Sequence, residues 1–260
     1  MTSSLQAAGI TTHLSSKTVL SDLDLPELQA NQLCALMGPN GCGKSTLLKS
    51  LAGLIKCRIK SLNYVDGNIP TTERQHPRAL FGYLPQYLPE GPNLTVMEAM
   101  LVAQANSATV SKRLQFDEAE SILEQLNILT LAHARADQLS GGQKQLLALG
   151  QLLSKKPRIL LLDEPFSALD MAHTYVVMSL LKNLTQQQQL LTIFVTHDLN
   201  FALLNADTVL LMKEGSLSGY GAPASVLNTN RIADVFGVRT RMEQSSRGQP
   251  FIFIDGPITQ

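Results

Sequence analysis

The stretch "QLCALMGPNGCGKSTLLKSLAG", residues 32–53, contains an apolar run, a glycine-rich loop and a helical pattern in direct succession. The apolar run ends in glycine, which is typical of a strand buried on both faces of a sheet. The segment "KSTLLKSLAG" has helical spacing and is closed by Gly53. A buried strand that passes through glycines into a helix predicts the first unit of an α/β sheet covered on both faces.

The glycine-rich loop, "GPNGCGKST" at residues 38–46, fits the pattern G-x-x-x-x-G-K-[ST]. Glycines allow successive backbone amides to point inward at phosphate oxygens, and the helix N-terminus adds the positive end of its dipole. Lys44 supplies a point charge for the terminal phosphates, and the Ser45 hydroxyl can ligate Mg²⁺. The pattern predicts a site for nucleotide phosphates and Mg²⁺, formed by Gly38, Pro39, Asn40, Gly41, Cys42, Gly43, Lys44, Ser45 and Thr46.

Around this unit, strand-like and helix-like runs alternate along the chain. The expected strands are "ALFGYLPQ" (79–86), "RILLLDE" (158–164), "LLTIFVT" (190–196) and "TVLLM" (208–212). Residues 95–105 and 117–126 have helical spacing with no β-rich segment between them, which indicates a helical insertion. A turn at Asp66-Gly67 is expected between two short strands, and the glutamines at 186–189 read as a solvated helix end.

These patterns predict an α/β fold: a P-loop core with a mostly parallel sheet, an N-terminal antiparallel β subdomain and an α-helical insertion. We expect one unit over residues 1–260. Its core would occupy about 1–85 and 155–215, its helical subdomain about 87–153, and a short C-terminal extension about 216–260.

The composition excludes several classes of protein. Lys plus Arg and Asp plus Glu are equal at 21 each, so no net charge favours nucleic acid or an anionic membrane surface. Apolar runs are far shorter than the roughly 20 residues that cross a bilayer, and the N-terminus has no export signal pattern. The three cysteines have no metal-ligand spacing and suit a reducing compartment. We therefore expect a cytosolic chain that reaches a membrane only through a protein partner.

Two carboxylates end the expected strand at 158–164. Asp163 is placed to reach the Mg²⁺ shell begun by Ser45, and Glu164 is suited to polarise the attacking water as a general base. The alternative is that Asp163 and Glu164 only cap a helix. A P-loop kinase would also have both the phosphate loop and this pair of carboxylates. These residues therefore predict phosphate chemistry without selecting the reaction.

The segment "LSGGQ", Leu139 to Gln143, distinguishes the reactions. Lying after a phosphate loop and before a carboxylate strand, it resembles the signature of the ATP-binding cassette family. Further motifs follow the family's order: "YLPQ" places Gln86 in the Q-loop, "SALD" places Asp170 in the D-loop, and "VTHD" places His197 at the switch histidine. The resemblance covers nearly the whole chain.

The resemblance implies an ATPase that works as a pair. Two copies would dimerise head to tail, so that Leu139, Ser140, Gly141, Gly142 and Gln143 of one copy face the γ-phosphate bound by the other. Glu164, His197 and Gln86 would be catalytic, Ser45, Gln86 and Asp163 would surround Mg²⁺, and Asp170 would carry contacts across the dimer. ATP closes such a dimer and hydrolysis loosens it.

A cassette must drive another protein. The resemblance implies transmembrane permease subunits, a periplasmic substrate-binding protein, and a peripheral location on the cytoplasmic face of the inner membrane. Residues 86–105 would form the surface that receives the permease, with Met97 and Met100 either contacting it or packing inside the insertion. The tail "GYGAPASVLNTNRIADVFGV" with "GQPFIFI" resembles importers of ferric siderophores, haem and cobalamin, which favours siderophore uptake. A soluble, non-transport cassette protein is the alternative from another class.

Three positions depart from the family pattern. Leu14 stands where an aromatic residue normally stacks on adenine, with His13 beside it as a smaller ring that could take this role. Leu146 and Gln151 replace arginines common after the signature, from which we expect altered packing.

Cys42 lies inside the phosphate loop, so thiol alkylation is expected to disturb nucleotide binding.

Overall fold

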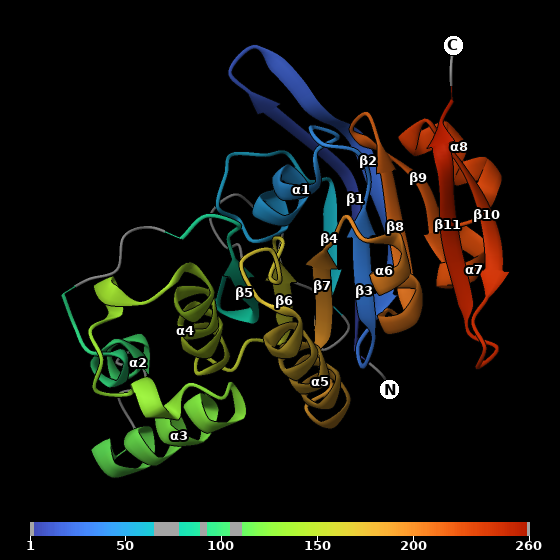
Figure 1. Ribbon diagram of the computed structural model, residues 1–260. Coiled ribbons are helices and arrows are strands. Elements are labelled where there is room, and N and C mark those ends of the chain that lie inside the picture. Colours follow the sequence, from blue (N-terminus) through green and yellow to red (C-terminus); the bar gives the residue numbers. More distant parts are fainter. Residues whose placement is uncertain (1–2, 65–77, 89–92, 105–110, 259–260) are drawn as a thin grey trace.

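The computed structural model of the chain describes residues 3–64, 78–88, 93–104 and 111–258. Its centre is a six-stranded sheet in the order β5-β6-β7-β3-β8-β9, in which only the β8–β9 pair is antiparallel (Figure 1). The strands are β3 (Leu33–Met37), β5 (Phe81–Leu84), β6 (Ile159–Leu162), β7 (Leu191–Val195), β8 (Thr208–Lys213) and β9 (Ser216–Gly221). The mostly parallel sheet predicted from the alternating runs is confirmed.

Both faces of this sheet are buried, which explains why its central strands are continuously apolar. Along β3, Leu33, Ala35 and Met37 point into one hydrophobic cluster, whereas Cys34 and Leu36 point into another. The remaining central strands alternate in the same way, because successive side chains of a strand project to opposite faces. Each central strand therefore contributes to two cores at once.

The first core lies between the central sheet and the N-terminal part of the chain. A three-stranded antiparallel sheet, β2-β1-β4, covers this face together with α1 (Lys44–Leu51). Its strands are β1 (Ser4–Leu14), β2 (Lys17–Gln29) and β4 (Ser61–Tyr64). The N-terminal antiparallel subdomain is thus confirmed, while the turn predicted at Asp66-Gly67 lies outside the described residues.

The helical insertion lies at one side of the molecule, beyond β5 (Figure 1). It contains α2 (Val96–Gln104), α3 (Lys112–Gln125) and α4 (Gly141–Leu153), with short 3₁₀ turns at Leu129–Leu131 and Ala136–Gln138. A third 3₁₀ turn, Arg78–Leu80, leads into β5. Met97 and Met100 are buried in the core of the insertion, so their role is internal packing. Leu146 is buried there as well.

The other face of the central sheet is covered by helices from the second half of the chain. These are α5 (Met171–Gln187), α6 (Leu199–Asn205), α7 (Pro223–Val226) and α8 (Thr229–Phe236). Helix α5 ends inside the glutamine run, and all four glutamines at 186–189 are exposed, as predicted. In the described part of the chain, the apolar helices all fall short of what a membrane crossing requires.

The chain ends in an antiparallel hairpin, β10 (Val238–Gln244) and β11 (Pro250–Pro257), which lies beside α8 (Figure 1). Asn200 of α6 holds it to the core through two hydrogen bonds with Ile252. The Asn200 amide donates to the Ile252 carbonyl at 3.0 Å, and the Ile252 amide donates to Asn200 Oδ1 at 2.7 Å. The hairpin, whose second strand contains the segment "PFIFI", is therefore an integral part of the fold.

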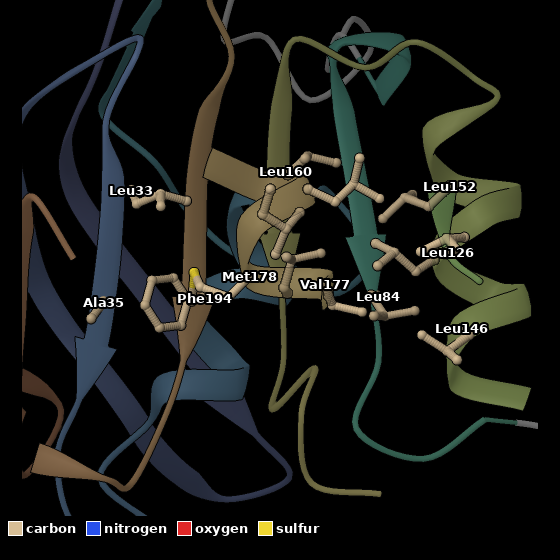
Figure 2. Packing of buried hydrophobic residues seen from close by; sticks show 14 of the residues in the cluster. Leu33, Ala35, Leu84, Leu126, Leu146, Leu152, Leu160, Val177, Met178 and Phe194 are labelled. Atoms are coloured by element: carbon tan, nitrogen blue, oxygen red, sulfur yellow. The ribbon is translucent and has the colours of Figure 1, made fainter. Parts of the chain in front are cut away.

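Figure 2 shows how the second core runs without interruption from the sheet into the insertion. Phe194 of β7 is fully buried in it, and its ring meets those of Phe166 and Phe201 edge to face, with centroids 6.0 and 6.3 Å apart. Leu160 of β6 and Leu84 of β5 continue the layer toward Leu152 of α4. The helical insertion and the central sheet therefore share one continuous hydrophobic core.

Replacing Phe194 with Ala should lower the free energy of unfolding by about 3–5 kcal/mol, because a large buried ring is removed and its cavity cannot collapse fully. Phe116→Ala is the matched control, since the Phe116 ring lies exposed on α3 and its loss should cost about 1 kcal/mol or less. Urea denaturation of the two variants measures the difference. Equal midpoints for both would contradict the placement of Phe194.

Candidate functional site

The phosphate loop, residues 38–46, leaves β3 and enters α1 at Lys44. Gly38 has φ 148° and lies so close to β8 that a Cβ atom there would be 2.4 Å from the Met212 carbonyl oxygen. Gly43, which precedes the helix, has φ 105°, a conformation that side chains disfavour. The loop can therefore fold tightly over the sheet edge only with glycine at these positions.

Lys44 lies under the loop and is 6% exposed. Its ammonium donates to the carbonyl oxygens of Gly38 and Pro39, at 2.8 and 2.9 Å. These contacts hold the Lys44 ammonium against the loop, close to the first residues of α1. The helix N-terminus and the ammonium thus place positive charge at one spot, where an anion such as phosphate is favoured.

Asp163 follows β6 and meets the loop directly. The Ser45 hydroxyl donates to Asp163 Oδ1 at 3.0 Å, and the Tyr83 hydroxyl donates to Asp163 Oδ2 at 3.2 Å. Burial, and then the Asp163 charge, raise the pKa of the Tyr83 phenol, which keeps it protonated as a donor. The Asp163 carboxylate is therefore held in place from two sides.

This pair of oxygens fits a magnesium ion. Among the described residues, no group of three or more His, Cys, Asp or Glu side chains could hold a metal by itself. Ser45 and Asp163 nevertheless converge on one point, and oxygen ligands suit Mg²⁺, which usually completes its shell with water and substrate phosphates. An ion there would neutralise charge on the terminal phosphates.

Glu164 is the centre of a second set of contacts. Gln86 Nε2 donates to Glu164 Oε2 at 2.9 Å, and His197 Nε2 lies 2.9 Å from Glu164 Oε1. Gln86 comes from the segment after β5 and His197 from the segment after β7, so three strand ends supply one cluster. The carboxylate, an amide and an imidazole together can orient and deprotonate a water molecule.

An open cleft of about 610 Å³ joins these groups and extends to the β1–β2 turn. Its walls are Leu14, Val19, Asn40, Gly41, Gly43, Lys44, Ser45, Thr46, Gln86, Tyr87, Glu164 and His197. His13 is not among them, because its ring turns to Thr18, at 3.0 Å from the hydroxyl. Leu14 and Val19 therefore offer apolar surface to the base of a nucleotide, and we expect Leu14 rather than His13 to contact that base.

The signature segment, Leu139–Gln143, lies elsewhere. Ser140 caps α4 by accepting from the Gln143 amide, while the Gln143 side chain accepts from the Ser140 amide. It borders a separate cleft of about 540 Å³ that also includes Asp170 and shares no residue with the first. Asp170 caps α5, and its carboxylate meets the His173 ring at 2.9 Å. The predicted site residues thus form two groups on one chain.

The structure places Cys42, whose alkylation is expected to disturb nucleotide binding, where a reagent has little access. Cys42 is 6% exposed, and its side chain belongs to the core beneath the loop. Burial raises the pKa of its thiol, against a smaller opposing effect of Lys44. Since thiolate is the reactive form, Cys42 should react slowly and acts as a packing residue.

The sequence analysis missed Tyr83 as a part of the site. Tyr83 belongs to β5, and residues inside a strand are usually interpreted as part of the hydrophobic core. Only the register of β5 beside β6 brings its hydroxyl to Asp163. No local sequence pattern marks this role, because Tyr83 and its partner Asp163 are 80 residues apart in the chain.

Comparisons with known proteins agree with this geometry. A family profile described as "ABC transporter" matches residues 20–167. The hemin import ATP-binding protein HmuV of Vibrio anguillarum is 33% identical over 91% of this chain and 92% of its own length. The sulfate/thiosulfate import ATP-binding protein CysA of Ralstonia nicotianae is 33% identical over 90% of this chain and 63% of its own length. A solved structure described as an inward-facing metal-chelate type ABC transporter matches with a TM-score of 0.78 and 25% identity, over 98% of this chain and 97% of that one.

Tyr83→Phe should weaken magnesium binding in the presence of ATP by about tenfold or more, because partners that orient a metal ligand typically contribute that much. Titration with Mn²⁺ followed by electron paramagnetic resonance measures the affinity directly. Tyr64→Phe, a buried tyrosine of β4 away from Asp163, serves as the control. Unchanged Mn²⁺ affinity in Tyr83→Phe would contradict the role of its hydroxyl.

Proposed function

The chain belongs to the ABC transporter family of ATP-binding proteins, and from this we propose that it is the ATP-hydrolysing subunit of a bacterial importer, driving uptake across the inner membrane. The import ATP-binding proteins among its relatives support uptake. The observation that carries ATP hydrolysis by a pair of copies is the separation of two clefts on one chain: the hydrolytic cleft, which contains Lys44 and Glu164, and the signature cleft, which contains Ser140. Each cleft is half of a site, and a second copy supplies the missing half.

In the proposed dimer, ATP lies between the phosphate loop of one copy and the signature segment of the other. The N-terminus of α4, with the Ser140 hydroxyl and the amides of Gly141 and Gly142, would face the γ-phosphate. These donors gain an anionic partner only when a triphosphate spans the interface. ATP therefore stabilises the closed dimer by mass action, and ADP does not.

Hydrolysis in this arrangement rests on Glu164 as general base. Gln86 and His197 already contact its carboxylate, so both are positioned to contact the attacking water or the γ-phosphate once nucleotide enters. Ser45 and Asp163 would hold Mg²⁺, and Gln86 would join that shell from its loop. Asp170, at the border of the signature cleft, would contact the partner copy.

We propose that the permease docks beside the Q-loop. Tyr87 follows Gln86 directly and is 83% exposed, although its neighbours on β5 are partly or fully buried. Val102 of α2 is likewise exposed. An exposed aromatic residue next to a catalytic residue suits a contact that couples docking to hydrolysis. Of the predicted surface, 86–105, residues 89–92 and 105 lie outside the described ranges.

For the cargo, we propose a ferric siderophore delivered by a periplasmic binding protein, with the chain peripheral on the cytoplasmic face. The C-terminal hairpin β10–β11 and the similarity to the metal-chelate transporter structure support a metal chelate. Hemin import by a relative makes haem the first alternative, and sulfate import by another relative shows how widely this sequence family varies in cargo.

The shared site predicts complementation between two inactive variants. Lys44→Ala removes the phosphate-loop charge, and Ser140→Asp keeps a good helix cap while opposing the γ-phosphate. Each variant alone should lose ATP hydrolysis. An equal mixture should recover at most about a quarter of wild-type turnover, because half of the dimers are hybrids with one competent centre.

Ser111→Asp is the matched control, because Ser111 caps α3 in the same way, away from either cleft. It should keep wild-type turnover. Failure of the mixture to recover any activity, or full activity of either variant alone, would contradict a shared site.

The cargo is tested by uptake in a bacterial strain that lacks this gene. Uptake of a ⁵⁵Fe-labelled siderophore should be lost and should return with the wild-type gene but not with Glu164→Gln. Haem and sulfate uptake are measured in parallel. Loss of haem uptake with normal siderophore uptake would assign the cargo to haem and overturn the siderophore proposal.

A further inference from the structure

Gln145 of α4 has a buried polar side chain whose hydrogen bonds go to backbone groups near the hydrolytic site. It is 4% exposed and lies two residues after the signature segment. Its Nε2 donates to the Glu164 carbonyl oxygen at 3.0 Å, and its Oε1 accepts from the Ala168 amide at 3.2 Å. One side chain therefore joins the signature helix to both ends of the segment 164–168.

That segment needs support because Glu164 has φ 52°, in the left-handed region that non-glycine residues rarely adopt. Its carbonyl also accepts from Ser167, through the amide at 3.2 Å and the hydroxyl at 3.0 Å. Those contacts close the turn on itself. Gln145 supplies the hydrogen bond to this carbonyl from another element, so it fixes the turn relative to α4.

A second contact keeps the same two segments together. A Cβ atom at Gly142 would lie 2.7 Å from the Ala168 carbonyl oxygen, so the backbone of the signature helix rests directly on the backbone of residue 168. Gln145, one turn further along α4, is hydrogen-bonded to the same residue. The start of α4 and the segment 164–168 are therefore held as one rigid unit.

We propose that Gln145 is a positioning residue that sets the orientation of Glu164 and ties it to the signature helix. This inference rests on the proposed function. A partner's nucleotide that binds at Ser140 acts on the N-terminus of α4. Through Gln145 and Gly142, the position of α4 determines where Glu164 presents its carboxylate to Gln86 and His197. The two half-sites of one chain are thereby coupled through the buried Gln145 amide and the close backbone contact at Gly142.

The test compares Gln145→Met with Gln151→Met in the full-length protein. Gln151 lies on the same helix, and its Nε2 also donates to a backbone carbonyl, that of Ala99 at 2.8 Å in the insertion. Gln145→Met removes two hydrogen bonds to backbone groups and Gln151→Met removes one, and only the first change lies beside Glu164. Gln145→Asn, one methylene shorter, cannot reach both partners and provides a second variant that keeps a polar group there.

Both Gln145 variants should lower kcat for ATP hydrolysis at least tenfold, because a small misplacement of a catalytic group has effects of this size. Their Kd for ATP, measured by calorimetry, should stay within twofold of wild type, since the phosphate loop is untouched. Gln151→Met should keep both values within twofold. Adding Gln145→Met to Glu164→Gln should lower the residual rate no further, because Gln145 acts through Glu164.

Hydrogen exchange in the nucleotide-free protein supplies a readout that needs no turnover. Amides of 164–168 should exchange at least tenfold faster in Gln145→Met, with β6 and α4 unchanged, whereas a general loss of stability would raise exchange everywhere. Unchanged exchange at 164–168, or kcat of both Gln145 variants within twofold of wild type, overturns the inference. Wild-type protein that neither binds nor hydrolyses ATP would instead count against the proposed function.

Discussion

Four parallel strands of the central sheet end at the same edge, and this constraint determines where the chemistry lies. The phosphate loop follows β3, Gln86 follows β5, Asp163 and Glu164 follow β6, and His197 follows β7. Residues as distant in sequence as Ser45 and Asp163 therefore come within hydrogen-bonding distance, at 3.0 Å. Burial of both sheet faces fixes the strand register, and the register fixes the site.

The same fold places the signature segment away from that edge. It begins α4, which packs on β5 from the insertion, and its cleft opens separately from the hydrolytic cleft. In the proposed dimer, this helix N-terminus would bind the nucleotide held by the partner copy. Because the insertion and the central sheet share one hydrophobic cluster, motion at the proposed partner contact would be transmitted to the sheet.

Much of this could be predicted from the sequence, because its signals are local. Continuous apolar runs predicted the buried strands, and the glycine pattern at 38–46 predicted the tight loop between β3 and α1. Tyr83 and Gln145 could not be predicted, because each acts through a partner brought close only by the fold: Asp163 across two strands, and Glu164 across a helix and a turn. The direction of single side chains also escaped prediction. His13 turns to Thr18 and leaves Leu14 in the cleft, and Cys42 points into the core although its neighbours line the site.

The central claim is that two copies of the chain share each nucleotide. The most direct measurement is a structure of the Glu164→Gln protein bound to Mg²⁺ and ATP, in which slow hydrolysis preserves the triphosphate. Our account predicts a symmetric dimer with two nucleotides, the γ-phosphate of each contacting Lys44 of one copy and Ser140 of the other. A nucleotide whose γ-phosphate contacts one chain alone, with the signature segment facing solvent, would contradict it.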